Sequence, residues 1–233
     1  MTLMKLIKFA AAALLALSSL SASASLISVV DSGSSAYAPD IDAYTNNNFT
    51  TPGYVTPDTY TIAGSLKANA KLAVTYYYLG QESSWNNVFS VPGDAEAPLK
   101  LSNKGTITTY VEKDALFDFL FTTYVPPTSV LPAHNLSVSN AQGATLGTNN
   151  RVYSFAVALN AMFTGQGPNA KAAHAGSYDA ILFLDDTGPY VGDDDNHDDL
   201  LIGVRVTAVP EPTTLLLMSM GLLGLFGARR LKA

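Results

Sequence analysis

Short apolar runs in the middle of the chain alternate large residues with small or polar ones. In residues 116–121, Phe117, Phe119 and Phe121 fall on one side of an extended chain. Asp118 falls on the other side, where it can face water. Because successive side chains of a strand point to opposite faces, a period of two indicates β-strands that bury one face. The pattern therefore predicts an all-β fold rather than a helical one.

Two later runs repeat this alternation. Residues 151–159 place large apolar side chains on one face, namely Tyr153, Phe155, Val157 and Leu159. Residues 200–206 place three branched residues opposite Arg205, namely Ile202, Val204 and Val206. With them, the predicted strands are 59–66, 71–79, 105–112, 116–121, 151–159, 178–184 and 200–206.

The spacing of these strands indicates their architecture. Gly, Pro, Asn and Ser separate the short runs, which is typical of an antiparallel β-sandwich, here expected to be jelly-roll-like. The body of this sandwich is predicted over residues 59–208. Residues 25–58 read as an irregular lead-in and residues 125–135 as a loop, because both are rich in turn-forming residues.

Composition limits the partners and the stabilising chemistry of this body. Between residues 25 and 209 the chain has 8 Lys and Arg against 18 Asp and Glu, a net charge of −10. Nucleic acid is therefore excluded as a partner, since phosphate binding needs clustered basic residues. The chain has no cysteine, which excludes disulfides, thiolate metal sites and a cysteine nucleophile.

The N-terminal residues 1–24 have the features of a secretory signal peptide. Lys5 and Lys8 form a basic start, and a mostly apolar stretch follows from Leu6 to Leu17. Ala22 and Ala24 then frame an A-x-A cleavage signal. We expect cleavage after Ala24 and export through the inner membrane.

The C-terminal residues 209–233 form a second segment that directs transport. The stretch Val209-Pro210-Glu211-Pro212 is followed by an apolar run over 213–228 and then by Arg229 and Arg230. A helix over that run would be about 24 Å long, short for a bilayer core of about 30 Å. Arginines that reach the headgroups and local thinning would let this transmembrane helix span. A permanent membrane anchor is the alternative to a removable tail.

These three parts, in this order, resemble a PEP-CTERM sorting tail. The resemblance implies an exported protein of a Gram-negative bacterium, recognised by an exosortase that cuts near Pro-Glu-Pro. The protein would then be released or attached at the cell surface. Many bacteria with this tail make exopolysaccharide, so the resemblance also suggests that partner and a role in biofilm. Because proteins with this tail have unrelated bodies, the tail implies no activity.

An acidic cluster precedes the last predicted strand. Seven aspartates lie between residues 185 and 199, and no Lys or Arg lies among them. Oxygen ligands on a turn are what Ca²⁺ requires, and Asp194, Asn196 and Asp198 are spaced by two. The candidate ligands are Asp194, Asn196, Asp198 and Asp199, with Asp185 and Asp186 completing the site. The alternative is a solvated turn whose side chains cap their own backbone.

The same stretch resembles a D-x-[DN]-x-[ND]-D motif of secreted bacterial β-sandwich proteins. Asn196 stands where an Asp is usual and His197 where an aromatic residue is usual. The resemblance implies acidic residues gathered at the mouth of one strand.

No motif of a known catalytic class is present, and the three histidines lie far apart in the sequence. We therefore expect no enzyme but an exported, non-catalytic surface or extracellular-matrix protein with Ca²⁺ as its cofactor. The alternatives are a secreted polysaccharide-acting hydrolase and a lectin-like sugar-binding protein. Paired carboxylates in a groove would favour the former, and exposed aromatics in a shallow cleft the latter.

Overall fold

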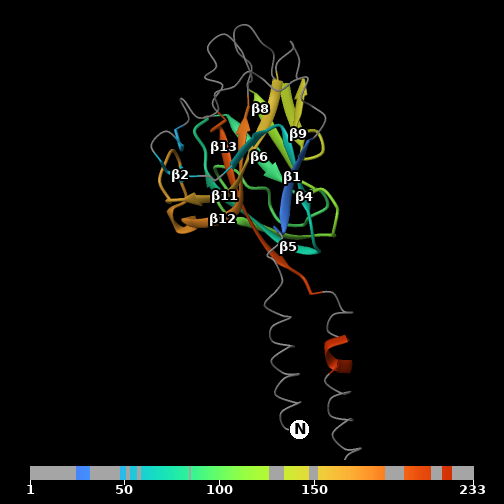
Figure 1. Cartoon of the computed structure of the whole chain (residues 1–233). Coiled ribbons are helices and arrows are strands. Elements are labelled where there is room, and N and C mark those ends of the chain that lie inside the picture. The colour runs from blue at the N-terminus through green and yellow to red at the C-terminus, as the bar shows by residue number, and fades with distance from the viewer. Residues whose placement is uncertain are drawn as a thin grey trace, which may run out of the picture.

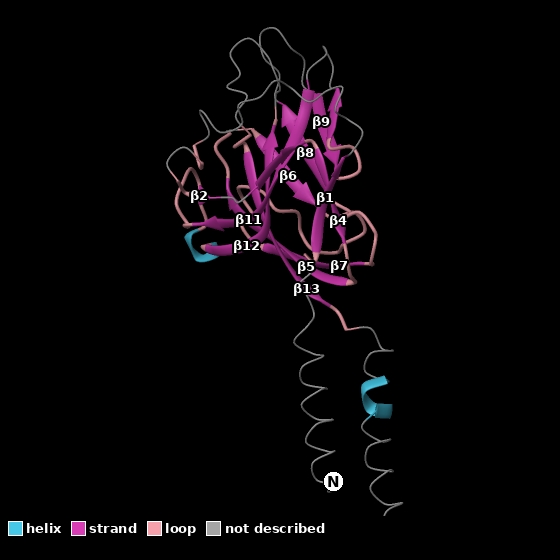
Figure 2. Cartoon of the chain, in the orientation of Figure 1, coloured by secondary structure: helices cyan, strands magenta, loops and turns pink. Residues whose placement is uncertain are grey.

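The strands pair into three antiparallel sheets, and the two larger ones face each other (Figures 1 and 2). The computed structural model describes residues 25–31, 48–50, 53–56, 59–83, 85–125, 134–146, 152–186, 197–210 and 217–221. The all-β sandwich predicted from the sequence is therefore confirmed.

The larger sheet has eight strands. Its path runs β10 (Ala144–Leu146), β11 (Val152–Phe163), β12 (Gly176–Asp185), β13 (Leu200–Ala208), β5 (Leu72–Gly80) and β7 (Thr106–Val111). Two short strands, β2 (Val55–Thr56) and β3 (Thr59–Ile62), also pair with β11. The last strand of the chain, β13, thus lies between β12 and β5, so strands far apart in sequence become neighbours.

A smaller sheet covers one face of the larger one. It consists of β6 (Asn86–Ser90), β8 (Leu120–Val125) and β9 (His134–Ser139). A separate pair is formed by β1 (Ile27–Asp31) and β4 (Gly64–Ala68). A 3₁₀ turn, η2 (Ala172–His174), precedes β12.

Aromatic rings fill the space between the two sheets. Phe89 and Phe121 of the smaller sheet lie with ring centroids 5.2 Å apart. Phe119 contacts Phe155 of β11 at 5.3 Å and Tyr76 of β5 at 6.2 Å. All five side chains are fully buried, so this cluster joins both sheets into one core.

The other face of the larger sheet has a second apolar cluster. It includes Phe49, Ala158, Ile181 and Phe183, all inaccessible to solvent. The predicted face of β11 is confirmed, since Tyr153, Phe155 and Val157 belong to the core between the sheets. The small residues on the opposite face of β11 are buried as well, which explains the continuous apolar character of β11 and β12.

The structure differs from the predicted elements at several places. Strands β6, β9 and β10 were not predicted, and β8 and β9 reach into residues 125–135, where a loop was expected. Strands β1 and β2 lie within residues 25–58, where an irregular lead-in was expected. The single strand expected over 59–66 is two strands, because Ala63 between them has a positive φ of 53°. Strand β8 begins at Leu120, although Phe117 and Phe119 before it are buried as predicted.

Both ends of the sandwich body are held by the turn between β4 and β5. The Asn69 side chain donates a hydrogen bond to the Ser25 carbonyl at 2.9 Å. Two residues further on, the Lys71 carbonyl accepts a hydrogen bond from the Val209 amide at 2.8 Å. The first and last residues of the body therefore lie side by side at one end of the sandwich, where the red end of β13 leaves it in Figure 1.

Candidate functional site

The opposite end of β13 brings the acidic residues together. Strands β12 and β13 are antiparallel, with Leu184 opposite Leu200. The Asp199 amide continues this pairing by donating to the Leu184 carbonyl at 3.1 Å. Asp185 and Asp186 at the end of β12 therefore meet Asp198 and Asp199 at the start of β13. All four side chains are at most 8% exposed.

Backbone amides orient two of these carboxylates. One Asp199 oxygen accepts a hydrogen bond from the Asp186 amide at 2.8 Å. One Asp198 oxygen accepts a hydrogen bond from the Asn48 amide at 2.5 Å. Each carboxylate is thereby held by one oxygen, so its second oxygen has a defined direction.

A buried polar chain from the smaller sheet supports the third carboxylate. The Asn87 side-chain amide donates to Asp186 Oδ2 at 2.7 Å and to the Asp199 carbonyl at 3.3 Å. Thr123 in turn donates to Asn87 Oδ1 at 2.6 Å and lies 2.8 Å from the Tyr153 hydroxyl. Asn87 and Thr123 are fully buried, and their bonds give the acidic end a fixed place across both sheets.

His197 is buried beside the cluster but adds no positive charge at neutral pH. Its Nε2 lies 3.1 Å from the Ser154 hydroxyl on β11. Burial lowers the pKa of the imidazole to about 3, because the charged form loses its hydration. The cluster is therefore not neutralised by this histidine.

The carboxylates repel one another. Burial raises the pKa of Asp199 well above its usual value, and the charges of Asp186 and Asp185 raise it further. The Asp186 amide opposes this by donating to the carboxylate. A bound cation would remove the cause of the repulsion, so the site favours one electrostatically.

Glu82 is a site residue that the sequence analysis missed. It follows β5, whose last residue Gly80 pairs with Leu201 of β13. Its amide donates to the Asp198 carbonyl at 3.1 Å. Carboxylate oxygens of Glu82, Asp198 and Asp199 lie within 4.8 Å of one another. Glu82 could have been predicted only from the pairing of β5 with β13, and neither segment shows this pairing by its own sequence.

The structure thus brings together four of the six predicted ligands: Asp185, Asp186, Asp198 and Asp199. The other two, Asp194 and Asn196, lie outside the described residues. Chemically, the arrangement offers only hard oxygen ligands on two strand ends and one loop, which suits a cation such as Ca²⁺.

The tail begins directly after the sandwich. Val209 is half-buried and held by Lys71, and Pro210 is exposed. Residues 217–221 are helical and exposed. The remainder of the predicted sorting segment lies outside the described residues, including Glu211, Pro212, Arg229 and Arg230, as do Ala22 and Ala24 of the predicted cleavage signal. Within the part of the chain that the structure describes, no helix has the length and apolar character needed to cross a bilayer.

Comparison with known proteins identifies this tail and nothing else in the chain. No curated protein and no solved structure matches the chain. Residues 208–230 match the PEP-CTERM protein-sorting motif. This match confirms the resemblance of the tail and marks an exported protein that an exosortase processes. The resemblance of the acidic stretch to secreted β-sandwich proteins is not supported by any match. The chain therefore carries a PEP-CTERM sorting signal that starts at the last residue of its final strand.

Proposed function

We propose that this exported protein is a non-catalytic surface or extracellular-matrix component that binds Ca²⁺ where β12 meets β13. Glu82, Asp198 and Asp199 are the central ligands, and Asp185 and Asp186 lie next to them. One observation carries this proposal: the carboxylate oxygens of the three central residues converge within 4.8 Å. Asp198 and Asp199 are buried and Glu82 is exposed, and like charges gathered beside a buried carboxylate are costly without a cation.

A cation at this site would act as a fold stabiliser. It would join the end of β5 to the adjoining ends of β12 and β13, which are brought together only by the tertiary fold. A ligand that binds the native state stabilises it by about 2.7 kcal/mol when its free concentration is a hundred times the dissociation constant. Millimolar extracellular Ca²⁺ is enough for a weak site of this type.

The placement of the first and last residues of the sandwich body supports removal of both the signal peptide and the sorting tail. Ser25 and Val209 are both bonded to the β4–β5 turn, so a cut at either side of the body leaves every strand in place. The nine residues of β13 separate this turn from the acidic end by about 30 Å. Processing and Ca²⁺ binding therefore take place at opposite ends of the body, and association with exopolysaccharide would follow once the tail has been cut.

Paired thermal melts of the exported protein test the Ca²⁺ site. We expect Ca²⁺ to raise the melting temperature relative to chelator, and Asp199→Asn or Glu82→Gln to abolish the difference. Asp199→Asn should also stabilise the chelated protein, because it removes one charge from the buried cluster. Asp118→Asn is the matched control, since Asp118 is exposed and lies outside the cluster. If the unaltered protein melts identically in millimolar Ca²⁺ and in chelator, the alternative is correct and the acidic cluster is a solvated turn without a metal.

Processing of the tail is tested separately. Glu211→Ala in the exporting host should leave a longer form in the membrane fraction, while Glu112→Ala should be processed normally. The intact mass of the exported protein should correspond to a chain that begins at or near Ser25. If the Glu211→Ala protein loses its tail as the unaltered protein does, processing does not depend on this motif.

A further inference from the structure

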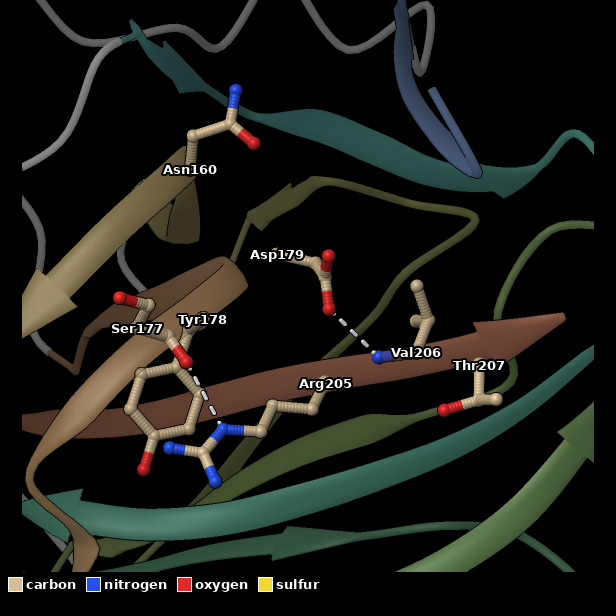
Figure 3. A pocket seen from close by; sticks show the side chains of 7 residues that line it. All are labelled: Asn160, Ser177, Tyr178, Asp179, Arg205, Val206 and Thr207. Carbon is tan, nitrogen blue, oxygen red and sulfur yellow. Dashed lines mark hydrogen bonds between the residues drawn. The ribbon is translucent and has the colours of Figure 1, made fainter. Parts of the chain in front are cut away.

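A polar hollow of about 490 Å³ opens between β12 and β13 (Figure 3). It lies where the two strands stop pairing with each other. Their ladder ends at the pair Ala180 and Val204. Beyond this pair β12 continues to pair with β11, whereas β13 continues to pair with β5. The sheet is therefore split at this point, and side chains occupy the place of backbone hydrogen bonds.

Two side chains bridge the split. Arg205 Nε donates to the Ser177 carbonyl at 3.0 Å, and the Val206 amide donates to Asp179 Oδ2 at 2.8 Å. Asn160 of β11 lies opposite Asp179 in the unshifted register of β11 and β12, and its backbone has a positive φ of 48°. A positive φ is uncommon for a residue other than glycine.

The Arg205 guanidinium is held in a fixed orientation. Its centre lies 4.9 Å from the ring of Tyr77 and 4.4 Å from the ring of Tyr178. Gly176 leaves room for it, since a Cβ there would lie 2.8 Å from Nη2. Among the described residues no carboxylate forms an ion pair with Arg205. A rigid guanidinium without a charged partner is organised in advance for a planar oxyanion, which it binds through two parallel hydrogen bonds.

Hydroxyl and amide groups surround this cation. Ser177, Thr207 and Asn160 line the hollow and are exposed. Asp179 lines it as well and is half-buried. The hydroxyls and the amide can both donate and accept hydrogen bonds, and the Asp179 carboxylate accepts them, which suits a ligand with several hydroxyls. The Tyr178 ring is covered by Arg205 and is 3% exposed, so the ligand binds by polar contacts and not by stacking on this ring.

We propose that this hollow binds the carboxylate-bearing residue of an acidic saccharide. Arg205 pairs with the carboxylate, and Asn160, Ser177, Asp179 and Thr207 bond to ring hydroxyls. The proposal rests on the extracellular location proposed above and gives the exopolysaccharide partner a chemical class, a polymer containing uronate residues. It does not depend on Ca²⁺, because Asp179 and the cluster residue Asp185 are six positions apart on β12, about 20 Å along the strand.

Titration calorimetry of the exported protein, in chelator, tests this site. The probes are an oligogalacturonate and a neutral glucose oligomer of the same length, with inorganic phosphate and acetate as simple anions. We expect the acidic oligomer to bind at least tenfold more tightly than the neutral one and more tightly than either simple anion. Arg205→Lys keeps the charge but loses the planar fork, and should weaken the acidic oligomer at least tenfold.

Two further variants make the result decisive. Thr207→Val removes one exposed hydroxyl and should weaken the acidic oligomer even if Arg205→Lys unfolds. Lys71→Gln removes a cation outside the hollow and should change nothing. Equal binding of the acidic and neutral oligomers, or no binding of either, would overturn the proposal. Binding of phosphate and acetate alone would overturn it too, since it would show a simple anion site. Ca²⁺ is absent throughout, so failure here is distinct from failure of the metal site.

Discussion

At the scale of single residues, Asn87 has the largest role in placing the acidic end. It is the one residue of the smaller sheet whose described bonds reach both Asp186 and Asp199. It is fully buried, and Thr123 completes its bonds. Its role was not predictable from the sequence, because an asparagine in a short strand resembles any turn-forming residue until the facing sheet is known.

Replacing Asn87 with Ala should lower the free energy of unfolding by about 2–3 kcal/mol. The change removes the hydrogen bonds that Asn87 forms with Asp186 and Thr123, and the loss of buried hydrogen bonds, one of them to a charged group, costs about 1–3 kcal/mol each. Asn86→Ala on the same strand is the matched control, because Asn86 is exposed. Urea unfolding measures both, and an equally small loss in the two variants would show that the buried chain does not hold the site.

At the scale of strands, β13 connects the features of this body. Its first residues adjoin the carboxylates, its second half lines the hollow and its last residue begins the sorting signal. Its alternation was readable from the sequence, and the predicted faces of Val204 and Arg205 are confirmed. Its central place between β12 and β5 was not readable, since pairing between distant strands depends on contacts that no local pattern contains.

Gly203, in the middle of β13, is expected to tolerate no side chain. A Cβ at this position would lie 2.4 Å from Cε1 of Tyr178, which has Arg205 on its ring. Gly203→Val should therefore destabilise the fold by about 1–3 kcal/mol through overpacking and should displace the guanidinium. Thr207→Ala, on the same strand but exposed, serves as control. Denaturant unfolding with unchanged stability for Gly203→Val would show that Tyr178 can move aside.

At the scale of the whole molecule, two packed sheets and a second apolar layer account for the stability of a chain without cysteine. The fold class was predictable because strand periodicity is local. Four of the acidic residues were predictable because they are near one another in sequence. Glu82 and the split between β12 and β13 were not, because both arise from the order of strands in the sheet.

The buried tyrosines predict how this molecule responds to alkali. Burial raises the pKa of Tyr178 to about 12, with Arg205 opposing the rise, and burial also raises the pKa values of Tyr76 and Tyr153. Because the pKa is raised only in the folded protein, the tyrosines ionise first in the unfolded chain. Their contribution to stability is therefore complete below pH 10 and is lost as the pH rises toward 12.

The free energy of unfolding should therefore fall above pH 10, by about 1.4 kcal/mol per pH unit for each such tyrosine. Tyr178→Phe should reduce this slope, while Tyr110→Phe should not, since Tyr110 is 69% exposed. Denaturant unfolding at successive pH values measures the slope. A Tyr178→Phe protein with the slope of the unaltered one would contradict the burial of this hydroxyl.

The most direct measurement of the proposed function is a crystal structure of the exported protein grown in millimolar Ca²⁺. We expect an ion between β5 and β13, with carboxylate oxygens of Glu82, Asp198 and Asp199 at about 2.3–2.6 Å from it. Carboxylates that hold no ion at this concentration, and that share protons or contact only their own backbone, would contradict it.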